Sequence, residues 1–128
     1  MHIYGFEKLV VWQKARTLVS KTYLITMDFP VEEKFGLTNQ IRRAATSVTA
    51  NIVEGTARSS QKEQAYYSQL SYGSLMELLN HFYIALDLGY ITENKILELK
   101  SDISEISKRL STLRKTQLNR HKQLNLKP

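Results

Sequence analysis

The residues from 96 to 113 carry the pattern that most constrains the fold, an apolar residue at alternating spacings of three and four. This spacing places the apolar side chains on one narrow stripe of a helix, as in coiled coils and helix bundles. A helix with such a stripe is marginal alone and gains its stability by packing against other helices. The stripe consists of Ile96, Leu99, Ile103, Ile106, Leu110 and Leu113, with Gln117 at the next position.

Three earlier segments also repeat their apolar residues at helical spacing. We predict helices over residues 6–27, 37–54 and 60–88, followed by the helix that contains the stripe. The first ends at Phe29-Pro30, because the residue before a proline is pushed away from helical conformation. Long helices joined by short loops become antiparallel neighbours. The predicted fold is therefore all-α, an antiparallel up-down four-helix bundle over residues 1–118.

Local signals mark the ends of these helices. Ser60 and Glu63 have the spacing of a capping box, and Thr92 is a plausible N-cap for the last helix. Gly55 and Gly89 are placed to end the second and third helices, since glycine adopts the left-handed conformation at little cost. We expect apolar packing to end near Gln117, which leaves residues 119–128 as a basic, disordered tail.

Composition excludes several classes of protein. The chain has no cysteine, so it has neither a disulfide framework nor thiolate metal sites. No apolar run reaches the roughly 18 residues that a membrane span needs, and the first seven residues do not resemble a secretory signal. We therefore expect a cytoplasmic protein without a membrane partner.

Charge is distributed unevenly along the chain. Residues 1–105 hold 11 Lys or Arg and 12 Asp or Glu, whereas residues 106–128 hold 7 Lys or Arg and no acid. Nucleic acid and acidic protein surfaces are natural partners for such a basic arm. A solubilising tail, or cations placed well at a helix C-terminus, would give the same composition.

Two groups of basic residues are candidates for binding nucleic acid. Tyrosines of the third helix could add stacking contacts, although they are more often packing residues. The first group is Lys108, Arg109, Arg114, Lys115, Arg120 and Lys122, and the second is Arg42, Arg43, Arg58 and Lys62.

The first and third helices have wider apolar faces than a monomeric bundle needs. Excess apolar surface usually marks association, so we predict a homo-oligomer, although the bundle could also hide these residues internally. A polar stripe on the second helix is either solvated surface or a hydrogen-bond network that is buried or lies at an interface. The candidates for the interface or network are Trp12, Gln40, Arg43, Ser47, Asn51, Glu54, Tyr67, Leu70 and Phe82.

Several blocks of sequence, in order, carry a resemblance that covers residues 5–115. They are Leu9–Ala15, Phe29-Pro30, Phe35–Thr38, Gln40–Ala45, Ser47-Val48, Asn51–Gly55, Gly73–Leu78 and Leu88–Ile91. The chain resembles the bacterial four-helix bundle family named for the protein of the 23S rRNA intervening sequence, which is sometimes labelled a ribosomal protein.

The resemblance implies a bundle that assembles as a ring, typically a pentamer. It also implies a gene that lies within an rRNA intervening sequence or stands alone. A related branch serves the reverse transcriptases of diversity-generating retroelements as an accessory subunit that contacts RNA or DNA. A reverse transcriptase or another nucleoprotein is therefore a possible partner, and the family implies no catalytic activity.

The sequence contains little that points to catalysis or cofactor binding. The three histidines, His2, His81 and His121, are far apart, and the inward Glu-x-x-His pairs of di-metal bundles are absent. We expect a hydrogen bond between Glu77 and His81, and no metal, cofactor or catalytic residue. Arg114 and His121 have a spacing found in HEPN ribonucleases, but a frayed tail could not hold catalytic geometry.

These patterns predict a non-enzymatic, homo-oligomeric scaffold that binds RNA or a nucleoprotein partner through its basic residues. Two alternatives remain open at this point. The chain could be a protein–protein adaptor that binds no nucleic acid, or a HEPN-like ribonuclease.

Overall fold

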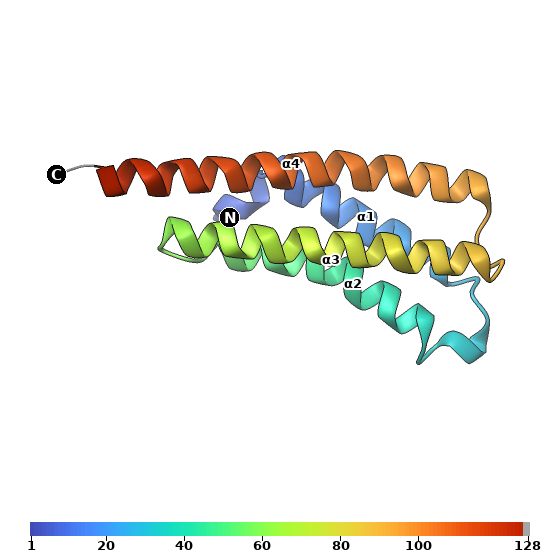
Figure 1. Cartoon of the computed structure of the whole chain (residues 1–128). Helices are drawn as coiled ribbons and strands as arrows, with labels where there is room; N and C mark the ends of the chain where they lie inside the picture. Colours follow the sequence, from blue (N-terminus) through green and yellow to red (C-terminus); the bar gives the residue numbers. More distant parts are fainter. Residues whose placement is uncertain (127–128) are drawn as a thin grey trace.

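The computed structural model describes residues 1–126 and contains four long helices. Figure 1 shows α3 and α4 side by side and antiparallel, with the N-terminus and the end of α4 toward the same end of the bundle. The predicted fold class, an all-α four-helix bundle, is confirmed. The elements are η1 (Gly5–Lys8), α1 (Val10–Thr26), η2 (Val31–Glu33), α2 (Leu37–Thr56), α3 (Gln61–Asp87) and α4 (Glu93–Leu126). Each helix within residues 1–126 is too short or too polar to cross a membrane.

The apolar stripe of α4 lies in the core, as the spacing predicts. Leu99, Ile103 and Leu110 are almost completely buried. They belong to one apolar cluster that also receives Phe82 from α3 and Ile41 from α2. The heptad pattern therefore fixes which side of α4 faces the rest of the bundle.

The N-cap hydrogen bonds expected at Ser60 and Thr92 are present in the structure. The Ser60 hydroxyl accepts a hydrogen bond from the Glu63 amide at 3.3 Å, and the Thr92 hydroxyl accepts one from the Lys95 amide at 3.1 Å. Gly89 follows α3 with a φ of 77°, the left-handed conformation that favours glycine.

Gly55 does not end α2, which continues to Thr56. Its role is close packing, because a Cβ at this position would lie 3.1 Å from the Cβ of Tyr67 on α3. The absence of a side chain thus lets the two helices approach closely just before the turn that joins them.

The predicted end of the last helix near residue 118 is wrong, because α4 continues to Leu126. Residues 119–126 contain neither proline nor glycine, so nothing in the local sequence stops the helix. The predicted disorder of Lys127 and Pro128 lies outside the described residues. The consequence is that the basic residues to Lys122 stand on a regular helix.

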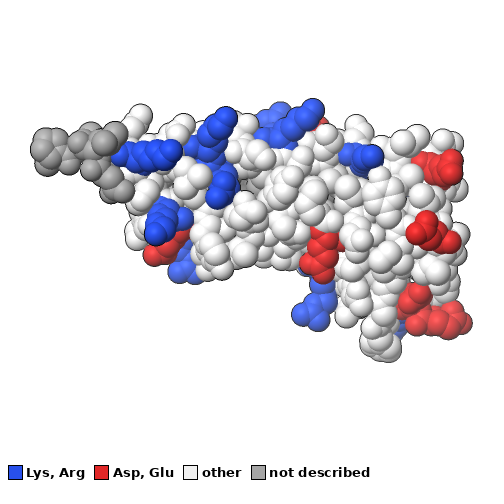
Figure 2. Space-filling view, viewed as in Figure 1, with Lys and Arg blue, Asp and Glu red and all other residues white. Residues whose placement is uncertain are grey.

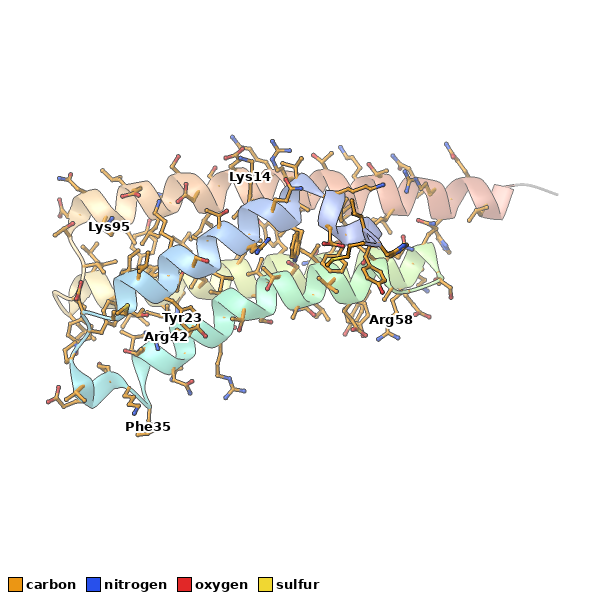
Figure 3. The ribbon with its side chains drawn as sticks, turned by 180° about the vertical axis from the view of Figure 1, so that it is seen from behind. Lys14, Tyr23, Phe35, Arg42, Arg58 and Lys95 are labelled. Atoms are coloured by element: carbon orange, nitrogen blue, oxygen red, sulfur yellow. The ribbon has the colours of Figure 1, made fainter. Side chains whose placement is uncertain are left out.

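Ion pairs bridge the open side of the bundle, where α1 and α4 face each other. Lys14 Nζ lies 3.0 Å from Glu105 Oε1, and Lys21 Nζ lies 2.8 Å from Asp102 Oδ2 and also contacts Glu98. Figure 3 shows Lys14 between these two helices. Charged side chains, in addition to apolar packing, therefore hold α1 to α4.

These ion pairs between α1 and α4 make the stability of the protein depend on pH in a defined direction. The hydrogen bond from Lys21 holds the pKa of Glu98 below its ordinary 4.5. The contribution of the pair is therefore complete above pH 4.5 and is lost as the pH falls through the lowered value. The bond to Asp102, more than that to Glu98, raises the pKa of Lys21 above 10.5, so the lysine stays charged throughout this range.

We expect Lys21→Met to lower the melting temperature at neutral pH, and we expect this difference to shrink as the pH falls from 7 through the lowered pKa of Glu98. Thermal unfolding of the parent and the variant across this range tests the prediction. A difference that is the same at every pH would show that packing of the lysine stem, and not its charge, stabilises the contact between α1 and α4.

Candidate nucleic-acid interface

The second half of α4 carries the basic residues of the predicted arm. Figure 2 shows Lys and Arg side chains along this helix toward its C-terminal end, whereas several Asp and Glu side chains gather at the opposite end of the bundle. On the face shown, the basic side chains therefore gather along the second half of α4, although Glu54 and Glu63 flank the turn between α2 and α3 at the same end of the bundle. Lys108, Arg109, Lys115, Arg120 and Lys122 are exposed, and Arg114 is half-buried.

Most of these cations are not neutralised by carboxylates. Arg109 Nη2 lies 3.6 Å from Glu105 Oε1, and Lys14 shares the same carboxylate oxygen. The side chains of Lys108, Lys115 and Lys122 make no hydrogen bond or ion pair among residues 1–124, the part of the chain whose side chains are described. Exposed, unpaired lysines of this kind are suited to contacting phosphates.

A groove of about 360 Å³ lies between the first half of α3 and the second half of α4. Its lining, within the described part of the chain, includes three cations and no carboxylate. The residues from α3 are Ser68, Gln69 and Tyr72, and those from α4 are Leu110, Ser111, Arg114, Lys115, Leu118, Asn119 and Lys122.

A buried polar pair joins the two helices beside this groove. Ser68 is 4% exposed and Gln117 is 5% exposed. The Ser68 hydroxyl donates a hydrogen bond of 2.7 Å to Gln117 Oε1. The buried stripe of α4 therefore continues past Leu113, where its next member, Gln117, makes a polar contact. The spacing of α4 located Gln117, but nothing in the sequence showed its partner on α3.

The second predicted basic group does not form one cluster. Figure 3 shows Arg42, on α2, well apart from Arg58, in the turn that follows α2. Arg42 Nε donates to Thr26 Oγ1 at 2.9 Å, and its guanidinium lies 4.6 Å from the centre of the Tyr23 ring. Arg58 pairs with Glu54 and donates to the Tyr67 hydroxyl at 2.9 Å. Both arginines thus connect parts of the bundle, and their guanidinium groups already have partners within the chain.

The other members of the second group, Arg43 and Lys62, are exposed. Arg43 lines a shallow depression together with Gln40, Ser47 and the acidic Glu77. A phosphate approaching Arg43 would therefore also meet a carboxylate. This depression is a weaker candidate for an anion than the groove beside α4.

The polar stripe of α2 forms an internal network only in part. Ser47 and Ser74 share a hydrogen bond of 2.8 Å between α2 and α3, and Asn51 Nδ2 donates to the Ser47 carbonyl at 2.9 Å. Gln40 and Arg43 remain exposed. The stripe thus combines the two roles that the sequence left open.

Phe82 cannot be an interface residue, because it is fully buried within the chain. A helical wheel shows that a face is wide, but it cannot show which part of that face other helices of the same chain cover. Tyr67 and Trp12 are half-buried, and Trp12 packs edge-on against Phe6 at 5.0 Å. Leu70 is 37% exposed and stays available.

The predicted contact between His81 and Glu77 is confirmed, with 3.3 Å between Nε2 and Oε1. No group of three metal-ligating side chains occurs among residues 1–126. Arg114 and His121 both lie within α4, so the argument that a frayed tail holds them is wrong. They stand two turns apart, about 10 Å along the helix axis.

Comparison with known proteins places this arrangement in a family. The family model described as 23S rRNA-intervening sequence protein matches residues 7–112. The chain belongs to this family. A similar solved structure is that of a protein of unknown function from the S23 ribosomal protein family of Bacteroides thetaiotaomicron VPI-5482. The two chains are 23% identical with a TM-score of 0.75, and the match covers 83% of this chain and 99% of the other. No curated protein matches the sequence.

Membership of the 23S rRNA-intervening sequence protein family confirms the resemblance seen in the sequence. The solved relative is similar enough to support the fold, and its own function is unknown. The matched range ends at Thr112, so the groove cations Arg114, Lys115 and Lys122 lie beyond it. The family match therefore covers the bundle but not the most basic part of α4.

Proposed function

We propose that this protein is a non-enzymatic, homo-oligomeric scaffold that binds RNA, alone or within a nucleoprotein, through the basic half of α4. The observation that carries the proposal is the set of exposed lysines on the second half of α4, a regular helix, that have no carboxylate partner among the described residues. Such a field attracts phosphates and orients the molecule toward them.

Assembly would multiply this field, and α3 has a surface suited to it. Tyr66, Leu70, Ile84 and Leu88 are exposed apolar side chains, with 59% of Tyr66 and 53% of Leu88 accessible. At 100° per residue they lie within about 40° of one another on the helix. They form two apolar patches, separated on this face by Gly73 and the exposed Glu77, and exposed apolar surface of this kind usually marks association. A ring, with a pentamer expected from the family resemblance, would present one basic α4 per subunit.

The first experiment is the mass of the protein in solution by light scattering, alone and with a structured RNA, at low and high salt. We expect a ring-sized mass that gains RNA at low salt and loses it at high salt. A monomer that ignores RNA would contradict the proposal. A ring that ignores RNA would favour the protein–protein adaptor.

We expect the triple variant Lys108→Gln, Lys115→Gln, Lys122→Gln to bind RNA about tenfold more weakly or worse at low salt. The slope of log affinity against log salt should also fall, by about one for each lost phosphate contact. The matched control is Lys8→Gln, Lys34→Gln, Lys100→Gln, which removes the same charge from exposed lysines elsewhere. Equal losses in the two variants would show that net charge, and not α4, decides binding.

The same samples test the ribonuclease alternative. RNA that stays intact during the binding measurements agrees with a scaffold. Cleavage by the parent protein that disappears in His121→Ala would instead identify an enzyme and contradict the proposal.

A further inference from the structure

We infer that the groove between α3 and α4 binds one nucleotide of an unpaired RNA segment, with the phosphate held by Arg114. This inference rests on the proposed function and narrows it from phosphate attraction in general to recognition of single-stranded segments. Four properties of the groove support this inference: its positive charge, the lack of a hydrogen-bond acceptor for Arg114, its size, and its position relative to the exposed apolar residues of α3.

The groove is built to attract an anion. Arg114, Lys115 and Lys122 contribute three cations, and none of the described lining residues is acidic. Gln69 and Asn119 add amide groups that can donate to phosphate or sugar oxygens. The depression around Arg43, in contrast, includes the carboxylate of Glu77. The groove therefore combines concavity with uncompensated positive charge.

Arg114 lacks the carboxylate partner that Arg58 and Arg109 each have. Arg58 pairs with Glu54, and Arg109 lies near Glu105. The guanidinium of Arg114 makes no hydrogen bond or ion pair with residues 1–124, whose side chains the structure describes, and its Nε is buried without an acceptor. A partly desolvated cation without an acceptor is costly. A phosphate in the groove would supply that acceptor, because a guanidinium can bind phosphate oxygens with two parallel hydrogen bonds.

The size and apolar lining of the groove fit a single nucleotide. Its volume of about 360 Å³ is at the lower end for small-molecule sites, which rules out the body of a duplex. The half-buried side chains of Tyr72 and Leu118 provide apolar surface against which a base or sugar can lie. Bases are available in this way in loops, bulges and single strands, where RNA is usually read. The bond between Ser68 and Gln117 holds the two walls in place before a ligand arrives.

Assembly through α3 would leave the groove open. The two exposed apolar patches, which contain Leu70 and Ile84, lie on one side of α3. Gln69 and Tyr72 point about 60° to 120° away from Tyr66, at 100° per residue. A subunit packed on these patches would therefore lie beside the groove. Each subunit of a ring could then hold one nucleotide.

The test compares Arg114→Gln with Arg109→Gln in the full chain. Both variants remove one arginine charge from the same helix, but Arg109 does not line the groove. Fluorescence anisotropy would measure binding of a labelled oligouridine strand of about ten nucleotides and of an RNA duplex of the same length. We expect Arg114→Gln to weaken binding of the single strand about tenfold and binding of the duplex no more than Arg109→Gln does. Lys122→Gln, at a second position in the groove, should also weaken binding of the single strand more than binding of the duplex. Melting curves test whether each variant folds.

Competition experiments separate the groove from general electrostatics. Uridine monophosphate should displace the single strand at lower concentration than inorganic phosphate, because the groove also contacts the sugar and base. Equal losses in Arg114→Gln and Arg109→Gln, with no preference for single strands, would overturn the groove and leave the scaffold proposal intact. Binding of uridine monophosphate that requires Arg114, in a protein that ignores RNA, would overturn the proposed function and keep a nucleotide site. No binding of any probe would overturn both.

Discussion

Replacing Phe82 by alanine is expected to destabilise the protein by about 3–5 kcal/mol, a fall of roughly 10–20 °C in melting temperature. The ring is fully buried in the cluster where α2, α3 and α4 meet. Removing it costs the transfer free energy of the side chain and leaves a cavity that a close-packed core fills only in part.

Tyr83→Ala is the matched control, because Tyr83 is the next residue on α3 and is 39% exposed. Both proteins should be unfolded by heat at the same concentration, since assembly would make the midpoint depend on concentration. We expect the control to lose much less stability. Similar losses would mean that Phe82 is not the core residue that its burial indicates.

The second large effect is expected at the buried pair of Ser68 and Gln117. Ser68→Ala should cost about 1–3 kcal/mol, because it leaves Gln117 Oε1 buried without a donor. Gln117→Leu should cost less, since the Ser68 hydroxyl also lies 3.3 Å from the Gln64 carbonyl and can donate there instead. The double variant should be close to the parent protein, because it removes both polar groups together.

A double-mutant cycle from urea unfolding measures this coupling. Ser101→Ala is the control, because it removes a hydroxyl from an exposed position on α4. Single substitutions whose costs simply add in the double variant would contradict a direct bond between the two helices. The result also bears on the groove, whose walls this bond connects.

The part of the candidate site that depends only on which charged residues follow one another along the chain was predictable from the sequence. The count of cations after residue 105 identified the basic half of α4, and the spacing of its apolar residues identified the helix that carries it. The sequence could not show which of these cations lack a bonding partner, because most of the partners come from other helices. Arg42 and Arg58 were expected beside Arg43 and Lys62 in one group, but contacts with Thr26, Glu54 and Tyr67 occupy them. Those contacts depend on how α1, α2 and α3 pack.

The groove itself could not be derived from the chain alone. Tyr72 and Arg114 are far apart in sequence, and they share a groove because α3 runs antiparallel to α4 in one particular register. The bond between Ser68 and Gln117 shows that register. Helical periodicity gives the face of each helix but not its axial position against a neighbour.

The sequence by itself determined the four helices, their buried stripes and the caps at Ser60 and Thr92, because spacing and capping act within a few residues along the chain. Only the tertiary structure decided that Phe82 is core, that Gly55 lets α2 approach α3, and that Arg114 is left without a carboxylate. Each of these depends on atoms brought together from different helices. Their energies are set by close packing and by desolvation, which exist only once the bundle has formed.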